Sequence, residues 1–91
     1  MSRPKKIRRI QFKPDITFFK PSGIPLRELE IIQLAHEEIE ALRLVHDKNL
    51  EQKKAAEQMK ISQSTLHRTL EKAYQKITQA MMHGKAIKIE G

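Results

Sequence analysis

Apolar side chains recur every three or four positions between residues 36 and 83, which is the period of an amphipathic helix. Short polar breaks interrupt the pattern twice. The pattern therefore predicts three helices, at about 36–45, 51–59 and 63–82. The third is the longest, and its roughly 20 residues would span about 30 Å.

Residues with known preferences for helix ends lie at the predicted boundaries. Asn49 tolerates the left-handed backbone conformation that stops a helix, and Gly84 supplies the same stop after the third helix. Lys60 and Ile61 form the turn between the second and third helices, and the Ser62 side-chain oxygen can cap the third.

Each predicted helix has one face that we expect to be buried. In the first helix this face is Ile39, Leu42 and Val45, and in the second it is Ala55, Ala56 and Met59. In the third helix the buried face is expected to be Leu66, Leu70, Ala73, Tyr74, Ile77, Ala80 and Met81. The residues that point the opposite way are Ser64, Arg68, Glu71 and Gln75, with Thr65 and His67 on the flanks.

The segments on either side of the helices are typical of extended chain. Pro21 and Pro25 exclude a long helix before residue 26. The short run 31–34 is either a strand or the beginning of the first helix, and its periodicity does not decide between the two. Ile87 and Ile89 alternate with polar residues and predict a short strand.

These elements predict a mainly α protein with a trihelical helix-turn-helix core and short extended or β segments at both ends. We divide the chain into a basic N-terminal arm with extended segments (1–33), a helix-turn-helix domain (34–83) and a strand-like tail (84–91). A chain of 91 residues is one structural domain at most.

Positive charge is concentrated at the two ends of the chain. Eighteen Lys and Arg against eleven Asp and Glu give a formal net charge of +7. The first 20 residues and the last third are basic, whereas residues 21–59 are mildly acidic. A net positive charge of this size favours binding to polyanions, and nucleic acid is the first candidate.

The third helix carries the residues that we expect to contact DNA. It would present Ser64, His67 and Arg68, with Gln63 at its leading end, toward a major groove. Arg68 and Gln63 are the candidates for reading bases because both side chains offer bidentate hydrogen bonding. Lys72, and Lys76 beyond it, could meet backbone phosphates. Further candidates for minor-groove or non-specific contact form a basic arm of Arg3, Lys5, Lys6, Arg8 and Arg9.

The residues of the turn resemble a known DNA-binding motif. Ala56, Ile61-Ser62, Thr65-Leu66 and Leu70 are similar to the helix-turn-helix at the C-terminal end of bacterial sigma factors, and the similarity extends upstream over 37–44. The chain as a whole resembles a small, largely uncharacterised prokaryotic family assigned to DNA binding on that motif. This wider resemblance includes Arg3-Pro4-Lys5, Phe18-Phe19-Lys20-Pro21, the run 23–30 and Gly84-Lys85-Ala86. It implies DNA binding by family assignment.

The chain departs from the pattern of that family in three places. Lys60 stands in the turn where such motifs usually have Gly. Ala35 stands where a capping Thr or Ser is usual, and its loss weakens the start of the first helix by about 1 kcal/mol. The family often has cysteines near the N-terminus, whereas this chain has none, so cysteine-based metal or redox sensing is excluded.

Other classes of function have little support in the sequence. His36-Glu37 opens like a zinc-protease helix, but Glu40 stands where the second His should be. No nucleophile elbow or phosphate-cradling glycine loop is visible, so we expect neither an enzyme nor a metal or other cofactor. No apolar stretch is long enough to span a bilayer, and we expect a cytoplasmic protein without membrane contact.

We therefore expect a sequence-selective protein that binds double-stranded DNA and regulates transcription, acting as a homodimer through the terminal strands or the second half of the third helix. One rival is an adaptor that contacts RNA polymerase or another protein through its acidic middle. The residues of that acidic surface would be Glu37, Glu38, Glu40 and Asp47. RNA binding is a third possibility, with few aromatic residues for base stacking.

Overall fold

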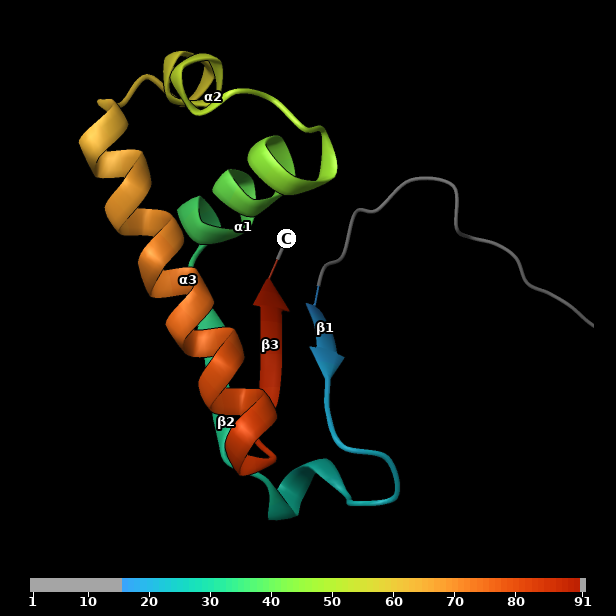
Figure 1. Ribbon diagram of the computed structural model, residues 1–91. Helices are drawn as coiled ribbons and strands as arrows, with labels where there is room; N and C mark the ends of the chain where they lie inside the picture. The colour runs from blue at the N-terminus through green and yellow to red at the C-terminus, as the bar shows by residue number, and fades with distance from the viewer. Residues whose placement is uncertain (1–15, 91) are drawn as a thin grey trace, which may run out of the picture.

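The computed structural model describes residues 16–90 and shows a mainly helical protein with a small three-stranded sheet (Figure 1). The fold class expected from the sequence is confirmed. The elements in chain order are β1 (Ile16–Phe19), a 3₁₀ turn (Leu26–Glu28), β2 (Ile31–Leu34), α1 (His36–Leu42), a π-helical turn (Arg43–Asp47), α2 (Gln52–Met59), α3 (Gln63–His83) and β3 (Ala86–Glu90). No helix within these residues has the length and apolar character needed to cross a bilayer.

The sheet joins segments from both ends of the described chain. Its order is β1–β3–β2, so the C-terminal strand lies in the centre. β1 pairs with β3 antiparallel, and β2 pairs with β3 parallel. The ambiguous run 31–34 is therefore a strand rather than the beginning of α1. Alternating Ile87 and Ile89 form the predicted strand, and the neighbouring strands provide the pairing that an isolated strand lacks.

The helical core lies where α1, α2 and α3 meet. Its buried residues are Ala41, Leu44, Ala55, Ala56, Leu66 and Leu70. Ala55 and Ala56 confirm the small inner face expected for α2, with Met59 partly buried against the same cluster. Because alanine is small, α2 can approach its neighbours closely in this region.

The prediction of which face of α1 is buried is wrong, because the buried positions each lie one residue before the predicted ones. Ile39, Leu42 and Val45 are only partly buried, whereas Glu38, Ala41 and Leu44 are buried. Neighbouring side chains on a helix point about 100° apart, so a shift of one residue means that a different face of α1 is buried. The small Ala41 lets α3 and α2 pack closely against this side, and that contact decides which face is covered.

The buried face of α3 is confirmed over its first half and in part over its second half. Leu66, Leu70, Ala73 and Ala80 are buried. Tyr74, at 36% exposed, and Met81, at 69%, were expected to be buried and are not. Tyr74 lies at the edge of the helical core, where its hydroxyl is 2.6 Å from Nε2 of His46 in the π-helical turn. Met81 lines an open hollow beside Phe19 and Ile87.

A buried carboxylate joins the helices to the sheet. Glu38 is 3% exposed, and its Oε1 accepts hydrogen bonds from Ala35 N at 2.7 Å and from Lys76 Nζ at 2.8 Å. Lys76 Nζ also donates to the carbonyl oxygen of Gln33 at 2.9 Å. The amine of Lys76 therefore bonds to groups of its own chain, and the expectation that Lys76 could meet phosphates is wrong. Glu38 also satisfies the N–H of Ala35, which has no side-chain cap to offer.

The helix ends follow the sequence expectations. Ser62 Oγ accepts a hydrogen bond from Thr65 N at 3.1 Å and caps α3. Asn49 and Gly84 adopt positive φ angles of 59° and 64° after their helices. Lys60 has a φ of 60°, so a lysine occupies the left-handed position in the turn between α2 and α3.

Removing Lys76 is expected to destabilise the fold because it leaves the Glu38 carboxylate buried without its cation. We expect Lys76→Ala to lower the free energy of unfolding by about 2 kcal/mol, less than for a fully buried pair because Lys76 is one-third exposed. The measurement is urea denaturation followed by circular dichroism. Lys72→Ala, on the exposed face of the same helix, is the matched control and should change stability by less than about 0.5 kcal/mol. Equal losses in the two variants would contradict this assignment.

Replacing Lys60 by glycine is expected to stabilise the protein. The left-handed conformation strains a side chain with a Cβ but not glycine, so Lys60→Gly should raise the free energy of unfolding by about 0.5–1 kcal/mol. Gly84→Ala is the reverse change at an equivalent φ and should lower it by about 1 kcal/mol. Thermal and urea denaturation test both variants, and a less stable Lys60→Gly would show that the lysine side chain stabilises the turn.

Candidate nucleic-acid interface

The tight turn between α2 and α3 orients the start of the longest helix. α2 ends at Met59, the left-handed Lys60 reverses the chain, and Ser62 caps α3 at Gln63. Leu66 and Leu70 then anchor α3 against the other two helices, and both are the most fully buried large side chains of the described residues. The anchored apolar side leaves the opposite side of the first turns of α3 in solvent.

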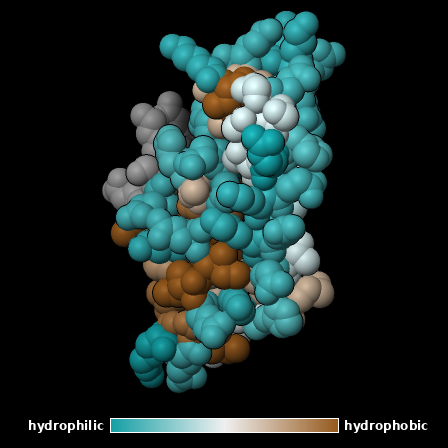
Figure 2. Space-filling view, turned by 90° about the vertical axis from the view of Figure 1, so that its left-hand side faces the viewer, coloured by the Kyte–Doolittle hydropathy of each residue, from teal (hydrophilic) through white to brown (hydrophobic). Residues whose placement is uncertain are grey.

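All five candidate residues on α3 lie on the surface. Gln63, Ser64, His67, Arg68 and Lys72 are exposed. Figure 2 shows this flank of the molecule as mostly hydrophilic, with apolar surface gathered mainly in its lower half, away from α2. Ser64, Arg68 and Lys72 follow one another at four-residue spacing, which places them along one side of the helix. The exposed Glu71 lies between the last two in sequence and reduces the positive charge there.

Hydroxyl groups at the helix start hold one another and reach Arg68. Thr65 Oγ1 accepts a hydrogen bond from Ser62 Oγ at 2.9 Å, and Arg68 Nη2 donates to the same Thr65 oxygen at 3.4 Å. Ser64 Oγ lies 3.1 Å from Ser62 Oγ. Thr65 therefore has a structural role at the start of α3. Within residues 16–90 no carboxylate forms an ion pair with Arg68.

Three further lysines lie on α2 and the turn, and the sequence reasoning did not assign them a function. Lys53 and Lys54 are exposed in the first turn of α2, and Lys60 is exposed in the turn before α3. These lysines lie within or next to residues 21–59, whose net charge is negative, so the distribution of charge along the chain did not single them out. The adjacent pair Lys53-Lys54 near the start of a predicted helix is the sequence feature that could have indicated a basic surface there.

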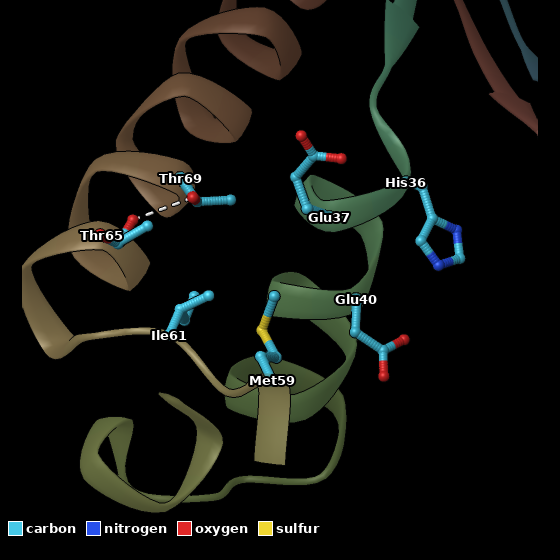
Figure 3. Close-up of a pocket in the computed structure, with 7 residues that line it drawn as sticks. All are labelled: His36, Glu37, Glu40, Met59, Ile61, Thr65 and Thr69. Carbon is cyan, nitrogen blue, oxygen red and sulfur yellow. Dashed lines mark hydrogen bonds between the residues drawn. The ribbon is translucent and has the colours of Figure 1, made fainter. Parts of the chain in front are cut away.

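Beside α3 lies a hollow of about 470 Å³ between α1 and the turn. Its lining residues are His36, Glu37, Glu40, Met59, Ile61, Thr65 and Thr69 (Figure 3). Thr65 and Thr69 face α1, and Glu37 lies between the two helices, whereas His36 and Glu40 point away from α3. Within the described residues no group of three acidic, His or Cys side chains is placed to hold a metal ion.

The acidic surface required by the adaptor hypothesis is only partly present. Glu38 is buried against Lys76, so it is not available to a partner. Glu40 forms an ion pair with Arg43 at 2.8 Å. The hydrogen bond from Arg43 lowers the pKa of the Glu40 carboxyl, so Glu40 stays ionised and paired. Glu37 and Asp47 remain exposed.

The basic arm that we expected to support DNA binding, Arg3, Lys5, Lys6, Arg8 and Arg9, lies outside the described residues.

The fold and this surface define a small α-rich protein with an exposed, capped helix following a tight turn. The chain belongs to the family described as protein of unknown function DUF134, whose model matches residues 1–91. No solved structure matches it significantly.

The chain is also similar to several proteins named UPF0251. It is 52% identical over 91 residues to the UPF0251 protein of Desulforudis audaxviator, covering all of this chain and 60% of that protein. It is 47% identical to the UPF0251 protein of Moorella thermoacetica, covering 61% of it. The protein TTE1845 of Caldanaerobacter subterraneus is likewise 47% identical and is covered to 77%. The chain thus spans about three fifths of the length of the first two relatives.

Proposed function

We propose that this protein binds double-stranded DNA with sequence selectivity, inserts the first half of α3 into the major groove and regulates transcription. The observation that supports this proposal is the arrangement of α3. Leu66 and Leu70 are buried against α1 and α2, while Gln63, Ser64 and Arg68 are exposed on the same turns. A helix is about 10–12 Å across with its side chains and fits a major groove about 12 Å wide.

Different residues have different tasks in this proposal. Arg68 and Gln63 read base edges because each can form two hydrogen bonds to one base. Ser64, His67 and Lys72 contact the sugar-phosphate backbone, as do Lys53, Lys54 and Lys60. These contacts set affinity and orientation but carry no sequence information directly. The arm of Arg3, Lys5, Lys6, Arg8 and Arg9 adds minor-groove or non-specific contact.

The sigma-factor resemblance supports the same docking geometry. Helix-turn-helix proteins place the second helix of the motif in the major groove, and in this chain that helix is α3. The proposal requires no catalytic residue and no cofactor, and it places the protein in the cytoplasm with the chromosome. The adaptor alternative lacks a comparable observation, because two of its four acidic residues, Glu38 and Glu40, have intramolecular partners.

Removing the Arg68 side chain is the direct test. We expect Arg68→Ala to raise the Kd for a duplex selected from random sequence about tenfold or more, because a bidentate base contact is lost. Arg68→Lys should retain much of the non-specific affinity but lose discrimination at one base pair, since lysine keeps the charge without the planar fork. Fluorescence anisotropy at several salt concentrations measures both effects.

Arg27→Ala provides the matched control. Arg27 is exposed in the 3₁₀ turn at the sheet end of the molecule, so this variant removes an equal charge far along the chain from α3. We expect its affinity to stay within about twofold of the wild type, since it loses only long-range attraction. Equal losses for Arg27→Ala and Arg68→Ala would reject α3 as the reading element. Absence of any wild-type binding at about 50 mM salt would reject DNA binding altogether.

A further inference from the structure

Within residues 16–90, one face of the sheet is apolar and only partly covered. The strand register places Phe19 and Ile32 beside Ile87, and Leu34 beside Ile89, and residues paired in this way share a face. Leu34 is buried on this face. Ile87 and Ile89 are only partly buried, and Phe19 is 55% exposed.

Two helices extend this apolar face on its open side. Ile39 and Leu42 of α1 line a hollow of about 540 Å³ together with Ile89. Met81 of α3 lines a second hollow of about 520 Å³ that includes Phe19 and Ile87. Ile87 and Ile89 are two residues apart on one face of β3, so the two hollows adjoin. We call the combined region the apolar surface, and its residues are Phe19, Ile39, Leu42, Met81, Ile87 and Ile89.

The apolar surface also contains three residues that the sequence pattern predicted to be buried and that residues 16–90 leave partly or largely exposed. Ile39 and Leu42 belong to the expected buried face of α1, and Met81 to that of α3. Exposed single apolar residues are common, but a contiguous apolar region contributed by four elements is typical of an interaction site.

We propose that the apolar surface binds a second copy of this chain in a two-fold symmetric dimer. Charged residues of both signs lie around this surface. Arg43 and Asp47 line one hollow. Lys20 and Lys85 line the other, and the positive charge of Lys85 is balanced by an ion pair with Glu30, outside the hollow, at 3.0 Å. A two-fold interface must be self-complementary, and a rim with both signs of charge meets that requirement.

The α2–α3 end of the molecule is less suited to meeting its own copy. Lys53, Lys54, Lys60 and Arg68 are exposed there beside the acidic Glu51 and Glu57, so basic residues are in excess and two such ends would repel each other. In a chain with a formal net charge of +7, self-association is favoured where the local charge is balanced.

Dimerisation through the apolar surface leaves the proposed DNA-reading side of α3 free. At about 100° per residue, Met81 and Arg68 point about 140° apart around the helix axis. Both copies can therefore use their α3 helices while the apolar surfaces are in contact. The pairing of two DNA half-sites by this dimer rests on the proposed function, whereas the dimer itself does not.

Adjacent methionines give a matched pair of variants. Met81 is 69% exposed and lines the apolar surface, whereas Met82 is 68% exposed and lines neither hollow. Sedimentation equilibrium and light scattering of the 91-residue chain without DNA measure the dimer dissociation constant. We expect Met81→Glu to raise that constant about tenfold or more, because dimerisation would bury a charge. Met82→Glu should leave it unchanged, and thermal denaturation should show both variants folded.

Ile31→Glu tests whether another apolar patch forms the interface instead. Ile31 is 48% exposed on β2 and pairs with Ala86, so it points to the opposite face of the sheet from Ile87. We expect this variant to dimerise like the wild type.

A wild-type chain that remains monomeric up to about 100 µM would overturn the inference and leave the apolar surface to another protein or another part of the chain. Equal weakening by Met81→Glu and Met82→Glu, or weakening by Ile31→Glu alone, would also overturn it. A dimer that depends on Met81 but binds no DNA would support the inference and reject the proposed function, so the two can fail separately.

Discussion

The hydrogen-bonded pair of Glu38 and Lys76 holds the helices and the sheet together. A carboxylate that is 3% exposed must have partners, because an unpaired buried charge is costly. Glu38 finds them in the N–H of Ala35 at the start of α1 and in Lys76 near the middle of α3, while Lys76 also holds the Gln33 carbonyl of β2. Three elements therefore have a fixed relative position. Exchanging either side chain for an uncharged one would loosen the junction between helices and sheet.

This junction divides α3 into two parts with different surroundings. Before Lys76, Leu66 and Leu70 pack on α1 and α2, and the polar side of the helix is open to a duplex. After it, the helix lies against the sheet through Ala80, and its flank at Met81 remains exposed. One continuous helix thus carries the proposed DNA-reading residues at its first half and the proposed dimer contact at its second. The length of α3 separates the two surfaces.

Much of the local structure could be predicted from the sequence because it depends on neighbours in the chain. The left-handed positions at Asn49 and Gly84 and the cap at Ser62 are determined within a few residues, and all three are as expected. The candidate residues Gln63 and Arg68 are exposed because their positions follow from the period of α3 and its buried leucines. In contrast, the covered side of α1 depends on the distant α3, and a hydrophobic period alone favoured Ile39 over the buried Ala41.

The three helices, the ends of α2 and α3 and the polar side of α3 could be predicted from the residues alone, since helical period, caps and glycine act over short distances along the chain. The end of α1 at Leu42 and the π-helical turn Arg43–Asp47 that follows it could not. The run 31–34 could not be recognised as a strand from local pattern, because its partner β3 lies more than 50 residues further along the chain. The same holds for Lys76, which resembles any surface lysine until α1 brings Glu38 to its amine. Contacts between distant segments also decided which apolar residues remain uncovered, and so where a second chain could bind.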